Sequence, residues 1–165
     1  MSDGRPALAL VVRDAVPTDR DVIALFNALL ATETEGKHLD PLVLERGVAI
    51  ALTEPDRLRY WVAEADGQII GQAAITREWS DWRNGWLWWL QSVYVHQDFR
   101  GRGVFRTLYQ HIRSVALELG DVIGLRLYVD DTNTLGQQTY QSMGMKPGGY
   151  HVYEEIWPDR FKRPG

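Results

Sequence analysis

The spacing of apolar residues along the chain predicts which segments are helices and which are strands. Apolar residues recur at helical spacing over 22–30 and over 104–119, and the second run stops at Gly120, a residue type that commonly ends helices. Asp40 followed by Pro41 predicts a helix start, because the aspartate can cap the first amides and proline fits the first helical position. Asn133 predicts the start of a fourth helix, which ends at Gly144.

Strand-like runs lie between and around these helices. Residues 8–13 form a short apolar run, and two apolar runs joined by Asp66-Gly67 predict a hairpin over 59–79. The run 85–95 is apolar on both alternating faces, which is typical of a central strand covered by helices. Further strands are predicted over 122–129 and 151–157, and a short extra one at 145–146.

These elements predict one mixed α/β domain over residues 1–165, in the order β-α-α-β-β-β-α-β-α-β. The expected sheet is mixed and mostly antiparallel, has about six or seven strands, and is flanked by about four helices.

Composition narrows the function classes. The chain has 165 residues, a net charge of −4 and no cysteine, which excludes disulfides and thiolate catalysis and gives no basic field for nucleic acid. The first residues do not resemble a signal peptide, and no apolar run is long enough to span a membrane. The four histidines lie far apart, which argues against a metal site. We therefore expect a cytoplasmic protein that binds neither nucleic acid nor membranes.

The stretch "HQDFRGRGVFRTLYQHI", residues 96–112, joins a strand to a helix through a loop with two glycines and two arginines. Gly101 and Gly103 let the backbone take a positive φ and approach a ligand, and Arg100 and Arg102 can pair with phosphate oxygens. The first amides of the helix lack intrahelical acceptors and suit an anion. The alternative is a tight turn with solvated arginines.

Two nucleotide motifs fit this loop poorly. A triphosphate loop needs lysine followed by serine or threonine, and neither follows Gly103. The dinucleotide fingerprint fits only halfway, because Arg106 stands where its third glycine belongs.

The loop resembles the acyl-CoA loop of the GNAT acetyltransferase superfamily, whose signature is Q/R-x-x-G-x-G/A. Arg100, Gly103 and Phe105 occupy the signature positions, and Phe105 stands where glycine or alanine is usual. The later stretch "NTLGQQTYQSMGM" resembles the family's N-x-x-A-x-x-x-Y-x-x-x-G-F helix, with Asn133 and Tyr140 in place. A weaker resemblance to spermidine/spermine-type diamine acetyltransferases covers residues 77–95.

The resemblance implies transfer of an acetyl group from acetyl-CoA to an amine by direct attack. It places the CoA contacts at Val93, Tyr94, Val95, Arg100, Gly101, Arg102, Gly103, Val104, Phe105 and Asn133. It also implies that Tyr140 protonates the CoA thiolate, which its ordinary pKa near 10 permits. Spacing alone favours the other interpretation, a core tyrosine that packs on a helix face.

The acceptor side is less defined by the sequence. Candidates for contact with the acceptor amine, as a base or a pocket wall, are Glu33, Glu35, Glu78, Trp79, Asp81 and Gln91. The diamine group carries acids where this chain has Gln91 and Ser92. Each acidic candidate could instead be a solvated surface group.

Three functions remain open from the sequence. The first is an N-acetyltransferase acting on a small amine, or on a protein or peptide amine. The second is a non-catalytic acyl-CoA-binding module, and the third is a nucleotide-binding oxidoreductase. The resemblance is also compatible with a homodimer.

Overall fold

The computed structural model describes residues 7–157, which form two compact units. The first unit ends at Tyr128, and the second begins at Val129 and contains the helix α4 (Thr134–Ser142). In chain order the first unit contains β1 (Leu10–Asp14), the 3₁₀ turn η1 (Pro17–Asp19), α1 (Arg20–Glu35), α2 (Pro41–Thr53), β2 (Arg59–Ala65), β3 (Gln68–Ser80), β4 (Gly85–Val95), the 3₁₀ turn η2 (Gln97–Phe99), α3 (Val104–Leu119) and β5 (Val122–Leu127). The expectation of a single domain stays a prediction.

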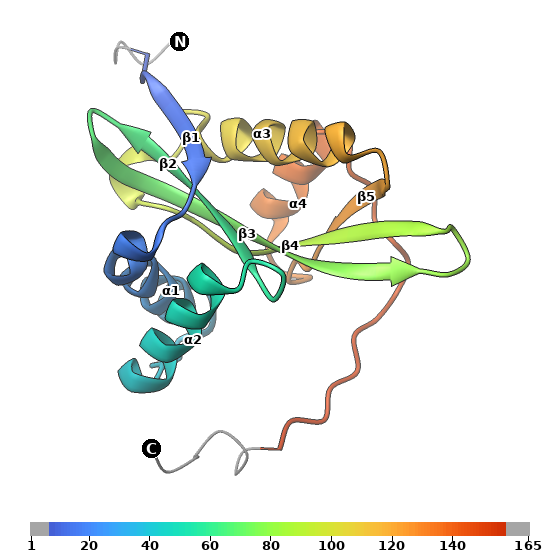
Figure 1. Cartoon of the computed structure of the whole chain (residues 1–165), viewed down its shortest axis with the longest axis horizontal. Helices are drawn as coiled ribbons and strands as arrows, with labels where there is room; N and C mark the ends of the chain where they lie inside the picture. The colour runs from blue at the N-terminus through green and yellow to red at the C-terminus, as the bar shows by residue number, and fades with distance from the viewer. Residues whose placement is uncertain (1–6, 158–165) are drawn as a thin grey trace. The chain divides into compact units, whose positions relative to one another are not determined.

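One five-stranded sheet organises the first unit. The strands follow the order β1-β2-β3-β4-β5, with antiparallel pairs throughout except between β4 and β5, which are parallel and joined through α3. Figure 1 shows α3 on one face of the sheet and α1 and α2 on the other. The predicted mixed α/β architecture with four helices is confirmed, although the sheet has fewer strands than expected.

The core lies on both sides of this sheet. Beneath α1 and α2 it contains the buried residues Ile23, Ala24, Val48, Ala51, Tyr60, Val62 and Ala74. Between α3 and the sheet, Leu108 and Ile112 of α3 and Trp61 of β2 are fully buried. The apolar stripe of α3 at three- and four-residue spacing therefore packs against the sheet, as the sequence predicts.

Local signals correctly predicted the turn between β2 and β3 and the start of α2. Asp66 and Gly67 both have positive φ, 51° and 76°, which fits a two-residue turn whose twist matches the strands. The Asp40 side chain accepts hydrogen bonds from the amides of Leu42 (2.9 Å) and Val43 (3.4 Å) at the start of α2.

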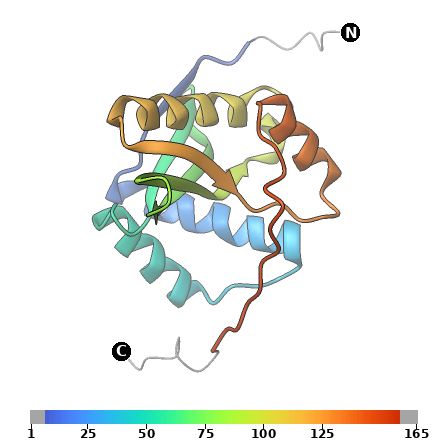
Figure 2. The same cartoon turned by 90° about the vertical axis from the view of Figure 1, so that its right-hand side faces the viewer.

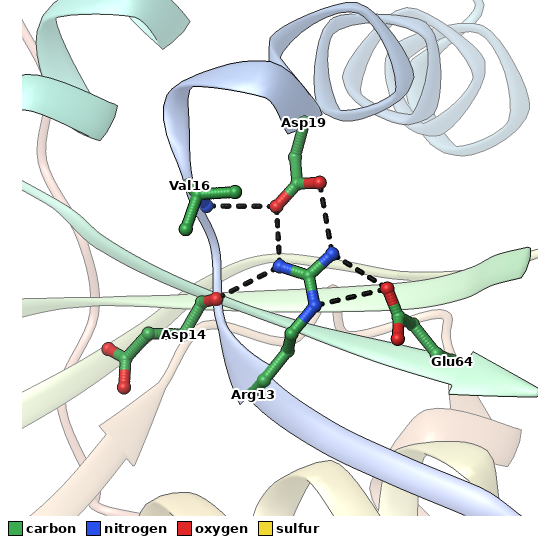
Figure 3. Close-up of polar contacts among 5 residues, drawn as sticks. All are labelled: Arg13, Asp14, Val16, Asp19 and Glu64. Carbon is green, nitrogen blue, oxygen red and sulfur yellow. Dashed lines mark hydrogen bonds and ion pairs between the residues drawn. The ribbon is translucent and has the colours of Figure 1, made fainter. Parts of the chain in front are cut away.

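A polar cluster around Arg13 ties β1 to the start of α1 (Figure 3). Arg13 donates to both carboxylate oxygens of Asp19, at 2.7 and 3.0 Å, and its Nη2 donates to Glu64 at 2.7 Å. Asp19 also accepts from the amide of Val16 at 2.8 Å. The hydrogen bonds from Arg13 hold the pKa of Asp19 below its ordinary value despite its burial.

The predicted strands over 151–157 and 145–146 are wrong. Residues 145–157 form neither helix nor strand, and Tyr150 and Tyr153 in this segment are exposed. A segment with strand-forming residues becomes a strand only where another strand provides hydrogen-bond partners. Within the described chain the sheet ends at β5 and pairs with no later segment. Figure 2 shows this segment in red, as an extended trace.

Candidate functional site

The predicted strand–loop–helix arrangement is confirmed. β4 runs into η2, and the loop 100–103 leads directly into α3, with Gly103 as the residue before its first turn. Gly101 and Gly103 have φ of 72° and 81°, and a Cβ on either would meet no atom within 4 Å. Glycine is therefore required here for its conformation and not for lack of space.

Gly71 on β3 brings α3 close to the sheet at this point. A Cβ on Gly71 would lie 2.9 Å from Cγ1 of Val104, the first residue of α3, and 3.3 Å from the carbonyl oxygen of Tyr94. The start of α3 is therefore packed against β3 and β4, which fixes the position of its amide groups. These amides lack intrahelical acceptors and lie at the positive end of the helix, so the site suits an anion.

The Phe105 side chain packs along its own helix. Its ring centroid lies 6.3 Å from that of Tyr109, one turn further along α3, and the two rings are tilted by 52°. The ring thus has a neighbour within α3.

Arg100 ties the loop to two other elements. Its Nε donates to the carbonyl oxygen of Val95 at 2.9 Å, and its Nη2 donates to Oε2 of Glu33 on α1 at 2.6 Å. The guanidinium also lies 5.3 Å from the centroid of the Tyr94 ring. The other loop arginine, Arg102, lies over the ring of Phe99 at 5.9 Å.

Glu33 holds two side chains at once. Its Oε1 accepts from the hydroxyl of Tyr94 at 2.8 Å, while Oε2 is bound to Arg100. Burial opposes ionisation of Glu33, but the hydrogen bonds from Arg100 and Tyr94 outweigh it, and the pKa of Glu33 lies below its ordinary value. Glu33 is therefore a carboxylate whose two oxygens are both engaged in holding the loop and β4.

The second half of β4 has a free edge. β4 pairs with β5 from Trp86↔Val122 to Leu90↔Leu127, and the register ends there, five residues before β4 itself ends. Residues 91–95 are paired with β3 on one side only within the described chain. Such an edge can hydrogen-bond an extended ligand as another strand would.

A bulge sets which amides face this edge. Gln91 pairs with Ala74 and Tyr94 with Gln72, so β4 has one residue more than β3 between these pairs. Ser92, in the bulge, has a φ of 51°, which is unusual for a residue other than glycine.

The bulge reverses the direction of the backbone groups along β4. The amide of Trp86 donates to Asp121, on the β5 side, at 2.8 Å, whereas the amide of His96 donates to Ile70 of β3 at 2.9 Å. Both positions are even-numbered and would face the same way in a regular strand. After the bulge the backbone N–H and C=O groups of the odd-numbered residues Val93 and Val95 therefore point away from β3, toward the free edge.

The predicted acceptor residues do not form one group. Gln91 and Glu78 lie on the same face of the β3–β4 pair; Gln91 donates to Thr76 at 2.6 Å, and Glu78 accepts from the indole of Trp89 and from Arg126. Trp79 lies on the opposite face, with its ring 5.0 Å from that of Trp86. Asp81 accepts from the amide of Trp82 in the hairpin turn, and Glu35 pairs with Lys37 beyond α1.

Two features of the site were missed from the sequence. Trp89 stacks on Tyr128 with 4.5 Å between ring centroids, and Arg126 lies 5.6 Å from the Trp89 ring. Gln72 is fully buried beside the bulge. A glutamine inside the apolar run "IIGQAAI" was the only signal available for Gln72.

In the second unit, Asn133 caps α4 as predicted. Its Oδ1 accepts from the amide of Gly136 at 2.9 Å, and a Cβ on Gly136 would lie 2.6 Å from the Asn133 side chain. Glycine at 136, where the family pattern has alanine, therefore leaves room for this cap. Burial raises the pKa of Tyr140, on the same helix, above its ordinary value.

Over residues 7–157, no helix is both long and apolar enough to cross a lipid bilayer. In the same part of the chain, no group of three or more histidine, aspartate or glutamate residues could hold a metal ion.

Comparison with known proteins gives a consistent match. The model of the acetyltransferase (GNAT) family matches residues 23–145. A possible acetyltransferase from Clostridium difficile 630 is 39% identical, with a TM-score of 0.83, over 90% of this chain and 97% of that one. Among curated protein sequences, none matches the chain significantly.

Two solved structures with lower sequence identity show that this chain has the same fold, and nothing beyond the fold. A predicted acetyltransferase with acetyl-CoA from Clostridium acetobutylicum is 20% identical, with a TM-score of 0.73, over 88% of this chain and 96% of that one. An aminoglycoside acetyltransferase from an uncultured soil metagenomic sample, in complex with sisomicin, is 14% identical, with a TM-score of 0.70, over 90% and 97% of the two chains.

Proposed function

Because the chain belongs to the acetyltransferase (GNAT) family, and so to the acyltransferases, we propose that it moves the acetyl group of acetyl-CoA to a primary amine of a small molecule. One observation carries this proposal. The free edge of β4 leads through the short turn η2 into the glycine loop and the first turn of α3, so a thioester arm and a diphosphate would have adjoining sites.

The loop would bind the diphosphate of CoA. The amides from Gly101 to Phe105 supply donors at the positive end of α3, and the backbone at Gly101 and Gly103 carries no Cβ to obstruct a phosphate. Arg100 stands beside them, anchored through Glu33 and Val95. The pantetheine arm would extend along residues 93–95, where an outward-facing amide can stabilise the oxyanion that develops on the thioester carbonyl.

The chemical step needs one proton donor and one acceptor. The amine nitrogen attacks the acetyl carbon, the carbon–sulfur bond breaks, and the sulfur leaves with its electron pair as the CoA thiolate. We assign protonation of that thiolate to Tyr140, whose raised pKa keeps it protonated at neutral pH. The proton lost by the amine passes to a base, so the products are the amide and CoA thiol.

The acceptor amine would lie on the face of β3–β4 that carries Glu78 and Gln91. Trp79 lies on the other face, so we leave it out of this site. Glu33 is a poor base here because both of its oxygens are engaged. A small-molecule amine is the acceptor that we propose, and a protein or peptide amine is the alternative.

Calorimetry with acetyl-CoA, CoA and NAD tests cofactor choice. We expect binding of acetyl-CoA and CoA but not NAD, and no binding of acetyl-CoA would contradict the proposal. A panel of diamines, aminoglycosides, amino acids and a peptide amine, scored by thiol release, tests the acceptor. Turnover of peptide amines alone would overturn the small-molecule assignment, and binding without turnover of any amine would favour an acyl-CoA-binding module.

A further inference from the structure

The bulge in β4 is held by a buried polar side chain from the neighbouring strand. Gln72 of β3 is fully buried, and its Nε2 donates to the carbonyl oxygen of Ser92 at 3.1 Å. Ser92 is the bulge residue with positive φ, a conformation that residues with a Cβ seldom adopt. The hydrogen bond therefore stabilises a residue whose backbone conformation is unfavourable.

Gln72 is itself oriented from behind by α1. Its Nε2 also donates to Oδ1 of Asn27 at 2.8 Å, and Nδ2 of Asn27 donates to the hydroxyl of Tyr60 at 3.0 Å. A chain of polar groups thus runs from β2 through α1 to the bulge. A buried polar network of this kind restricts its members to one arrangement, because any other would leave donors unpaired.

The hydrogen bond from Gln72 to the bulge does not serve to pair all polar atoms of Gln72. Gln72 has a buried Oε1 without a hydrogen-bond partner among the described residues, so its burial is not explained by full pairing of its own side chain. The side-chain nitrogen of Gln72 donates to both Asn27 and Ser92, although this orientation leaves Oε1 unpaired.

We propose that Gln72, oriented by Asn27, is a positioning residue for acetyl-CoA. It holds the Ser92 bulge, and the bulge turns the backbone groups of Val93 and Val95 toward the free edge of β4. The inference rests on the proposed function, since it concerns the strand along which the pantetheine arm would extend. Gln72 is fully buried, so it acts through the β4 backbone and not by contact with the ligand.

The test compares two ligands in calorimetry. Acetyl-CoA requires both the β4 edge and the loop, whereas adenosine 3′-phosphate 5′-diphosphate has the nucleotide and diphosphate of CoA without the pantetheine arm. Replacing Gln72 with methionine keeps the side-chain length and removes the donor. We expect Gln72→Met to weaken acetyl-CoA binding about tenfold and to leave binding of the nucleotide probe within about twofold of wild type.

A double variant separates positioning from general loss of stability. Glycine adopts positive φ readily, so Ser92→Gly should let the bulge persist without the hydrogen bond from Gln72. We expect the Gln72→Met/Ser92→Gly protein to recover acetyl-CoA affinity to within about threefold of the Ser92→Gly protein. Asp19→Asn, which disrupts a buried polar cluster outside the site, serves as the stability control and should leave acetyl-CoA affinity unchanged.

The outcomes separate the two hypotheses. Wild-type protein that binds no acetyl-CoA contradicts the proposed function itself. If the wild type binds acetyl-CoA and Gln72→Met binds it equally well, only the role of Gln72 is overturned. The same holds if Gln72→Met loses affinity for both ligands equally and adding Ser92→Gly does not restore acetyl-CoA affinity. If Gln72→Met does not fold, Asn27→Ala on the half-buried face of α1 replaces it. Acetyl-CoA affinity unchanged in Asn27→Ala would then overturn the proposal.

Discussion

Glu33 illustrates how the surroundings of one residue limit its chemistry. Its two carboxylate oxygens bind Tyr94 and Arg100, and its pKa is lowered by those hydrogen bonds against the effect of burial. A general base must be free to accept a proton from the attacking amine. At the scale of the residue, Glu33 is better suited to anchoring the loop than to catalysis.

We therefore predict that Glu33→Gln raises the KM for acetyl-CoA several-fold and lowers kcat by less than about threefold, whereas loss of a general base typically lowers the rate by about a hundredfold or more. Steady-state kinetics at saturating amine measures both parameters. Glu118→Gln, an exposed acid on α3, is the matched control and should change neither. A fall in kcat of about a hundredfold in Glu33→Gln would identify Glu33 as the base.

For Tyr140 we predict the opposite result, a loss of kcat without a loss of acetyl-CoA affinity. Tyr140→Phe removes only the hydroxyl, so kcat should fall by about a hundredfold while acetyl-CoA affinity stays within about twofold. Stopped-flow detection of thiol release gives the rate, and calorimetry gives the affinity. Tyr150→Phe, at an exposed position in the same unit, controls for loss of a phenol. Full turnover by Tyr140→Phe would show that another group protonates the thiolate.

At the scale of the element, the loop before α3 depends on backbone conformation. Gly103 has a φ of 81° and open space where a Cβ would lie, so Gly103→Ala introduces conformational strain without a steric clash. We expect about a tenfold loss of acetyl-CoA affinity, because about 1–2 kcal/mol of strain either distorts the loop or opposes its bound form.

Gly67→Ala is the matched control for this loop. Gly67 has a similar φ of 76°, also with open space, in the turn between β2 and β3. Both variants should lose similar free energy of unfolding in urea, and only Gly103→Ala should lose acetyl-CoA affinity. Equal affinity losses in the two proteins would show that the effect is a general one of stability.

Elements with strong local signals could be predicted from the sequence, and those that depend on partners could not. The turn between β2 and β3 is specified by Asp66-Gly67, the start of α2 by Asp40-Pro41, and α3 by its apolar stripe, and in each case the residues responsible are close together in the sequence. The segment 151–157 contains β-branched and aromatic residues, which are typical of strands, but lacks a neighbouring strand within the described chain. In the candidate site, the glycine loop was visible as a motif. The Arg100–Glu33 pair was not, because 67 residues separate its members.

At the scale of the whole molecule, the Arg13 cluster links pH to stability. The pKa of Asp19 is lowered in the folded protein, so this carboxylate stabilises the fold fully above its ordinary pKa of 3.8. The contribution is lost as the pH falls below that value toward the folded-state pKa. Because Asp19 connects the end of β1 to the start of α1, its protonation weakens the junction between sheet and helix.

We predict that Asp19→Asn lowers the free energy of unfolding by roughly 2 kcal/mol at pH 6, because a charged hydrogen bond to Arg13 is lost. The difference from wild type should shrink as the pH falls below 3.8. Urea denaturation at a series of pH values measures it. Asp21→Asn, an exposed acid two residues later in the first turn of α1, should change stability little at any pH. A difference that stays constant down to strongly acidic pH would contradict the assignment.

The bulge in β4 has a consequence for insertions and deletions. Between Gln91 and Tyr94 the strand contains one residue more than the strand opposite it. Deleting Ser92 would restore equal residue counts and keep the backbone groups of Val93 and Val95 facing outward. It would also remove the bulge, and we expect β4 and β5 then to continue pairing beyond Leu90. The number of residues in this strand, and not only their identity, therefore determines whether its edge stays open to a ligand.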